Sequence, residues 1–296
     1  MSKVDFEFYP HIVDLIWEHI TDPYTAGQVC TSWRKRALKL IYHHLSADMH
    51  NGRWRLWMKT DDEDIHCKYL LAGADTAPTL DSDAAARHTE ILDVLWPRTW
   101  SGGSTTAKLA EKFPRLHTMR VHTKEYGDLK GIGETQVYSW FSRETSRVTI
   151  RAHEAQTLVV LIAVERAPLS DGLFDIEMRL SRQLLQACYD AKDLVVVFNP
   201  HPVAGAPRIS SAPLARDVAE YLGVTCNSFN ITVVGAESLL RDEVGGAYEN
   251  FKSAVLRKLA ARNSGHGVRF VTHEEYKAVV GRETYKLHCV PDVRWR

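Results

Sequence analysis

Four short apolar segments recur at almost equal spacing along the second half of the chain. The segments LVVLIAV, LVVVF, ITVVG and VRFVT start at residues 158, 194, 231 and 268, so the intervals are 36, 37 and 37 residues. Between them, apolar residues follow a helical spacing within 173–184, 214–221 and 244–259. This periodicity indicates repeated strand–helix units, and helical crossovers between consecutive strands make the strands parallel.

The four segments are apolar almost throughout, which predicts strands that are buried on both faces of a sheet. Two earlier segments, 91–96 and 116–122, add further strands, whereas residues 46–90 read as an irregular stretch. The segment FPRLHTMRV resembles a degenerate leucine-rich repeat strand. The sequence therefore predicts an α/β fold with an irregular parallel β-α domain, either leucine-rich-repeat-like or an open sheet.

A second region, residues 8–45, is rich in large apolar side chains. Pro10 suits the first turn of a helix, and the apolar spacing after it predicts a helix over about 10–20. The turn signal Asp22-Pro23 ends that helix, and a second apolar stripe predicts another over about 24–45. Helices this short leave apolar surface that must meet another body, either the rest of the chain or a second protein.

The same region is similar to the F-box, whose pattern is Leu-Pro-x-Glu-Ile, an apolar helix and then Val-Cys-x-x-Trp-Arg. The positions that match are Tyr9, Pro10, Ile12, Leu15, Ile16, Ile20, Val29, Cys30, Trp33 and Arg34. Tyr9 stands where the family has Leu, and His11 stands where it has an acid. The segment between Ile20 and Val29 is a few residues short, which predicts a trimmed middle helix.

In that family the module docks the Skp adaptor of cullin-RING ubiquitin ligases, and the rest of the chain selects a substrate. The resemblance implies a Skp-type adaptor and a protein substrate as the partners of this chain. It places partner contacts at Pro10, Ile12, Leu15, Ile16, Ile20, Val29 and Trp33. The remainder of the chain, especially its ending GVRFVTHEEYKAVVG, resembles F-box-like proteins of fungal type.

Composition narrows the classes of partner. The 296 residues include 37 Lys plus Arg and 37 Asp plus Glu, so no net charge draws the chain to nucleic acid or to an anionic membrane. The five cysteines are isolated, which favours reduced thiols and a cytoplasmic or nuclear compartment. The first residues lack the uninterrupted apolar run of a signal peptide, and the longest apolar run is too short to span a bilayer.

The loops that follow the predicted strands are the candidate positions for chemistry, because α/β folds bind ligands at that edge. Gly102 and Gly103 lie in a loop that suits a phosphate, but the spacing of a P-loop is absent. Asn199 and His201 follow another strand, and no Ser or Cys in a nucleophile context accompanies them. The histidines lack carboxylate or Cys partners at metal-ligand spacing. We therefore predict no catalytic, cofactor-binding or metal-binding residues and no cofactor.

These observations predict a non-enzymatic F-box-like recognition protein with a helical module over 1–45 and a β-α domain over 46–296. The alternative is an α/β enzyme that binds a nucleotide or sugar nucleotide at the C-terminal ends of its parallel strands. In that alternative Gly102, Gly103, Asn199 and His201 converge on one pocket. A further alternative leaves the N-terminal helices as a cap on the end of the sheet.

Overall fold

The computed structural model describes residues 10–20, 23–50, 53–58, 68–70, 82–95, 112–123, 128–131, 133–142, 149–152, 155–164, 191–199, 230–239, 247–260 and 267–290. The helices are α1 (Pro10–Glu18), α2 (Pro23–Ala26), α3 (Thr31–His43), α4 (Ser82–His88), α8 (Ala236–Leu239), α9 (Ala247–Ala260), α10 (His273–Val280) and α11 (Arg282–Cys289). The strands are β1 (His44–His50), β2 (Arg53–Met58), β3 (Lys68–Leu70), β4 (Ile91–Leu95), β5 (Thr118–Thr123), β6 (Asp128–Gly131), β7 (Thr135–Ser142), β8 (Thr149–Ala152), β9 (Thr157–Val164), β10 (Asp193–Asn199), β11 (Asn230–Val234) and β12 (Val268–Val271).

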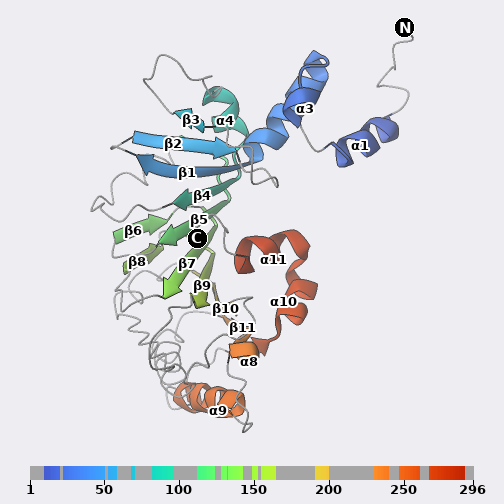
Figure 1. The fold of residues 1–296 in the computed structure, drawn as a ribbon. Helices are drawn as coiled ribbons and strands as arrows, with labels where there is room; N and C mark the ends of the chain where they lie inside the picture. Colours follow the sequence, from blue (N-terminus) through green and yellow to red (C-terminus); the bar gives the residue numbers. More distant parts are fainter. Residues whose placement is uncertain are drawn as a thin grey trace, which may run out of the picture.

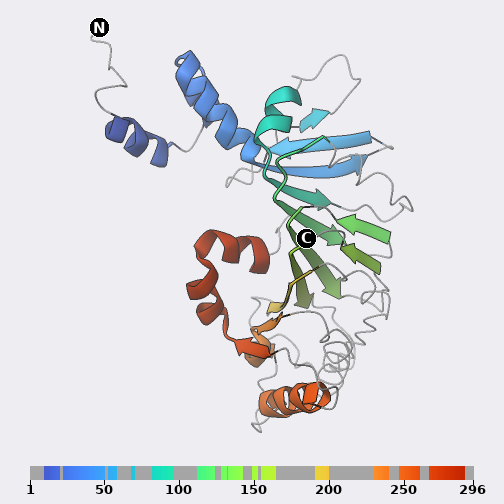
Figure 2. The same cartoon turned by 180° about the vertical axis from the view of Figure 1, so that it is seen from behind.

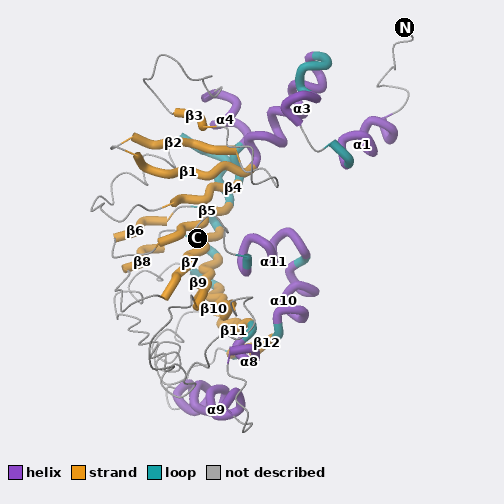
Figure 3. The backbone as a smooth tube through the Cα atoms, in the orientation of Figure 1, coloured by secondary structure: helices purple, strands orange, loops and turns teal. Residues whose placement is uncertain are grey.

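Most described strands belong to one ten-stranded sheet, in the order β12-β11-β10-β9-β7-β5-β4-β1-β2-β3. From β1 to β12 in this order every neighbouring pair is parallel, and the strands after β3 are added in one direction, while β2 and β3 lie on the other side of β1. Figures 1 and 3 show the strands side by side from β2 towards β11, with α10 and α11 along one side. The chain is thus α/β, as the sequence predicts.

The predicted strands are confirmed for the segments that begin at 91, 116, 158, 194, 231 and 268, which correspond to β4, β5, β9, β10, β11 and β12. The prediction of an irregular stretch over 46–90 is wrong. This stretch contains most of β1, all of β2, β3 and α4, and β1 pairs with β2 in an antiparallel hairpin. The two residues between the paired His50 and Arg53 are Asn-Gly, which is a strong sequence signal for a hairpin of two antiparallel strands.

One face of the sheet packs against α9, which contacts β10 and β12. Alternate residues of β9 and β10, such as Leu158 and Val196, are at most 2% exposed on this face. Here Phe251 of α9 meets Phe198 of β10 edge to face, with ring centroids 6.2 Å apart. The helical spacing predicted within 244–259 is therefore confirmed, since its buried residues Phe251 and Val255 point to the sheet.

The opposite face is covered by the C-terminal helices α10 and α11. Val159 of β9 and Val197 of β10 form a buried cluster with Tyr276 of α10 and Cys289 of α11. A hydrogen bond of 2.7 Å joins Tyr276 Oη to Nδ1 of His288 inside this layer. Both faces of the central strands are therefore buried, as their continuous apolar sequence predicts.

A buried ion pair lies on the same face, closer to β1. Arg120 of β5 and Asp93 of β4 are 2% and 0% exposed, and their Nη1 and Oδ2 atoms are 3.5 Å apart. Arg120 also donates through Nη2 to the carbonyl of Val290, at 2.6 Å. The Arg120 side chain thus links the residue after α11 to β5, which lies 170 residues earlier in the chain, and through Asp93 to β4.

Candidate docking surface on the N-terminal helices

The N-terminal helices have a small core of their own. Val13 and Trp17 of α1, Ala26 of α2 and Ala37 of α3 are at most 8% exposed and pack together. The rings of Trp17 and Trp33 lie with centroids 5.1 Å apart. Aromatic pairs of this kind bury much surface per residue, which lets such short helices hold one arrangement.

The chain forms three helices here, where the apolar spacing predicts two and the F-box resemblance implies a trimmed helix between them. The first predicted helix is confirmed as α1, whereas the predicted helix over 24–45 is interrupted after Ala26 and begins again at Thr31. Gly27 donates its backbone N–H to the carbonyl of Pro23 at 3.0 Å, and the chain then turns into the extended Cys30 that precedes α3. The middle helix α2 has only four residues, in agreement with the short segment between Ile20 and Val29.

A polar and aromatic contact fixes α1 against α3. Arg36 Nη1 lies 2.6 Å from Asp14 Oδ1, and the guanidinium sits 5.4 Å from the centroid of the Trp17 ring. The Arg36 and Asp14 side chains are 43% and 58% exposed, so water weakens the pair to less than about 1 kcal/mol. The contact therefore sets the direction of α1 more than it stabilises the fold.

The residues predicted to contact a partner fall into two groups. Ile12, Leu15 and Ile16 are 43%, 54% and 43% exposed on one side of α1, and Val29 is 67% exposed in the turn before α3. Ile20 and Trp33 instead pack against the core of the module. Pro10 is the first residue of α1, at the position that its sequence context predicts.

Leu40 belongs to the apolar stripe that the helical spacing predicts over 24–45, and it lies at the surface. Its side chain is 51% exposed, while Ala37 on the same helix is 1% exposed. The helix α3 packs against α1 and α2 through a cluster that includes Ala37 and does not include Leu40, and it also meets α4. A helical pattern alone does not distinguish a core stripe from an exposed one, so the sequence held no signal for this position.

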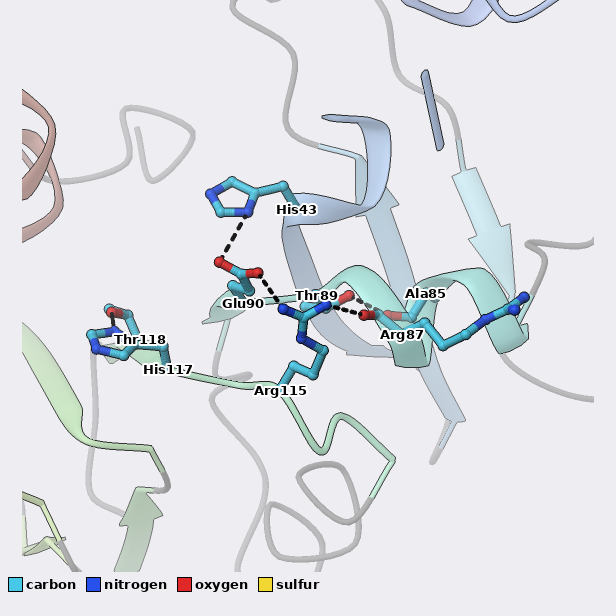
Figure 4. A network of polar contacts seen from close by, with 8 residues as sticks. All are labelled: His43, Ala85, Arg87, Thr89, Glu90, Arg115, His117 and Thr118. Atoms are coloured by element: carbon cyan, nitrogen blue, oxygen red, sulfur yellow. Dashed lines mark hydrogen bonds and ion pairs between the residues drawn. The ribbon is translucent and has the colours of Figure 1, made fainter. Parts of the chain in front are cut away.

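The module joins the sheet through the end of α3. His44, directly after α3, begins β1, and the predicted boundary after residue 45 stays a prediction. His43 accepts a backbone hydrogen bond from Glu90 at 3.1 Å, and its ring lies 3.6 Å from the Glu90 carboxylate. Arg115 contacts the other oxygen of that carboxylate at 3.4 Å (Figure 4). Figures 1 and 2 show α1 and α3 extending away from the β1 end of the sheet, so α1 is free of the β-α domain.

A groove of about 470 Å³ runs between the α2 turn and α3. Its apolar lining is Gly27, Ala37, Leu38 and Ile41, and its polar lining includes Gln28, Cys30 and Arg34. The Cys30 thiol is exposed and lies 3.2 Å from the Ser32 hydroxyl, a hydrogen bond that lowers the pKa of the thiol. The volume is in the range of sites that hold a few side chains or a small ligand.

The residues of the enzyme alternative are only partly described. Gly102, Gly103 and His201 lie outside the described residues, and Asn199 is the last residue of β10. At the ends of β10 and β11, the ring of His273 lies 2.9 Å from the carbonyl of Phe198. The start of α10 therefore fills the edge of the sheet at this point.

Strand order also bears on the enzyme alternative. Doubly wound sheets bind ligands where the strand order reverses, because neighbouring crossovers then leave on opposite faces and open a crevice. Among the described strands, β4 to β12 are added in one direction without reversal, whereas β2 and β3 lie on the other side of β1. The described residues also contain no group of three or more His, Cys, Asp or Glu side chains that could hold a metal ion.

No helix in the described part of the chain combines the length and the apolar character needed to cross a membrane. Comparisons with protein-family models, with curated proteins and with solved structures give no match to this chain.

Proposed function

We propose that the N-terminal helices are an F-box-like docking element for a Skp-type adaptor. In this proposal the β-α domain is a non-enzymatic recognition domain that presents a protein substrate to a cullin-RING ubiquitin ligase, in the cytoplasm or nucleus. The resemblance of the first 45 residues to the F-box suggests the adaptor, and the geometry of the helices supports a docking role.

The observation that carries the proposal is that α1 has apolar residues on two sides, one buried in the module and one exposed to solvent. Val13 and Trp17 hold the helix to the module, while Ile12, Leu15 and Ile16 on its other side are 43% to 54% exposed. A nine-residue helix that served only as a cap would bury its apolar residues against the sheet. Burial of a side chain of Leu or Ile size contributes about 1.5 to 3 kcal/mol, so a few such residues suffice for specific association.

The architecture of the β-α domain supports a recognition role over catalysis. The parallel strands from β4 to β12 are added in one direction from β1, with 17 to 47 residues between the starts of neighbouring parallel strands. This order favours a degenerate leucine-rich-repeat-like solenoid. Such solenoids bind other proteins through broad surfaces and lack the crevice of a doubly wound sheet.

The test is binding of purified Skp-type adaptor to the full chain by calorimetry. The double substitution Leu15→Asp and Ile16→Asp places two charges in the contact and is expected to weaken binding at least about a hundredfold, given the energies above. The matched control is Leu256→Asp with Val279→Asp, which alters residues of similar exposure, 43% and 67%, on α9 and α10. Equal affinity of the two variants, or no binding by the wild type, would refute the proposal.

A further inference from the structure

The outer surface of α3 carries an unusual distribution of charge. The helix TSWRKRALKLIYH contains Arg34, Lys35, Arg36 and Lys39 and no acidic residue. All four side chains are exposed, and Arg36 is paired with Asp14. The chain as a whole is neutral, so these charges are a local concentration. A surface of one sign attracts a partner surface of the opposite sign and repels one of the same sign.

The groove between the α2 turn and α3 lies next to these cations. Arg34, Leu38 and Ile41 are spaced so that they share one side of α3, and all line the groove. Lys35 and Lys39, four residues apart, lie on the neighbouring side of the helix. The groove thus offers an apolar floor with a guanidinium at its edge, a combination that fits an apolar side chain next to a carboxylate.

We propose that this groove receives an acidic segment of the docking partner, with an apolar side chain inserted beside Arg34 and carboxylates facing Lys35 and Lys39. The inference deepens the proposed function, because it specifies the chemistry of the partner surface that meets the same module. It adds a second contact region, on α3, to the apolar ridge on α1.

A protein fits this surface better than a nucleic acid, although both are anionic. The phosphate backbone of a nucleic acid has little to bury against Leu38 and Ile41 or against the exposed Val29 and Leu40. A protein segment buries apolar side chains there and pairs its carboxylates with the flanking cations.

The experiment measures binding of the full chain to four purified probes by fluorescence anisotropy. The probes are the Skp-type adaptor, an amphipathic helical peptide with Leu on one side and Glu elsewhere, the same peptide with Lys in place of Glu, and a single-stranded DNA. The test variant is Arg34→Glu, Lys35→Glu and Lys39→Glu. The matched control is Arg257→Glu, Arg269→Glu and Arg282→Glu, which makes the same change of net charge at exposed positions outside the module.

The inference predicts that the wild type binds the adaptor and the Glu peptide and that added salt weakens both complexes. The test variant is expected to lose about tenfold or more in affinity for both, and the control is expected to retain it. Leu38→Ser, which makes the groove floor polar, is expected to weaken the same two complexes without changing their dependence on salt.

The remaining outcomes separate the inference from the proposed function. Full adaptor binding by the test variant, with loss in the Leu15→Asp, Ile16→Asp variant, overturns the inference and leaves the function. If the Glu peptide binds and the adaptor does not, the inference is supported and the adaptor is refuted as the partner. Equal or tighter binding of the Lys peptide or the DNA overturns the inference, and no binding of adaptor or Glu peptide overturns both.

Discussion

The buried histidine of α11 gives the chain a defined dependence of stability on pH. His288 is 6% exposed and shares a hydrogen bond of 2.7 Å with Tyr276. Burial, with a smaller effect of the nearby Arg120 guanidinium, lowers the pKa of His288 from its ordinary value of 6.5 to about 4. The folded chain therefore keeps this ring neutral at a pH where the unfolded chain would protonate it.

The sign of the effect follows from the number of protons that each state binds. Between about pH 6.5 and pH 4 the unfolded state binds more protons at His288, so the free energy of unfolding falls as the pH falls. The contribution of His288 is fully present above the unfolded pKa and is lost towards the folded pKa. Lowering the pH from about 7 to about 5 is expected to remove about 2 kcal/mol through this residue.

The assay is urea unfolding followed by tryptophan fluorescence, at several pH values, for the wild type and for a double variant with Tyr276→Phe and His288→Phe. Replacing both members of the pair leaves no buried polar atom without a partner, so the variant isolates the proton effect from a packing loss. Between about pH 7 and pH 5, the free energy of unfolding of the wild type minus that of the variant should fall by about 2 kcal/mol. A parallel dependence on pH in both proteins, or an NMR titration of His288 near its ordinary pKa, would refute the reasoning.

Three further outcomes follow from buried or strained positions. Gly235→Ala should destabilise the chain by about 2 kcal/mol or more in thermal unfolding. The reason is that φ of Gly235 is +74° and that an added Cβ would lie 2.7 Å from the backbone oxygen of Phe198. The control is Gly267→Ala, which has open space around it and should change the stability little. Arg120→Met should cost about 1 to 3 kcal/mol in urea unfolding, because the buried Asp93 carboxylate loses the guanidinium and keeps the His44 ring at 3.1 Å; a loss below about 1 kcal/mol would contradict a stabilising buried pair. Cys30 is exposed and should react with a thiol reagent in the native protein. Cys289 is 2% exposed, and burial raises the pKa of its thiol to about 12, so it should react only after unfolding. Mass spectrometry of the labelled peptides measures both reactions.

The C-terminal helices show how a local signal can be present and still be missed. Thr272 accepts from the backbone of Glu275, and the Glu275 side chain accepts from the backbone of Thr272, which is a capping box that starts α10. The spacing of Thr and Glu is visible in the sequence. The position of α10 and α11 over β9 and β10 is not, because no local pattern specifies which distant strands a helix will cover.

The docking surface was predictable only in part. The apolar spacing of residues 10–20 fixes α1 and indicates more apolar surface than the module can bury. Whether Ile12 or Val13 faces solvent depends on where Trp17 meets Trp33, and that contact joins residues on different helices. The groove beside Arg34 likewise exists only because the chain turns after Ala26 and α3 begins at Thr31.

The sequence by itself determined the local elements of this protein: the near-equal spacing of apolar segments predicts the parallel strands, and the helical spacing of the first 45 residues predicts their helices. These features depend on neighbours in the chain, so periodicity and turn residues suffice to predict them. Only the tertiary structure decided that the strands from β4 to β12 add in one direction from β1, that α10 and α11 cover one face, and that Leu15 and Ile16 stay exposed. Each of these features depends on contacts between residues far apart in the chain. Several arrangements are equally compatible with the local sequence pattern, and packing and burial select one of them.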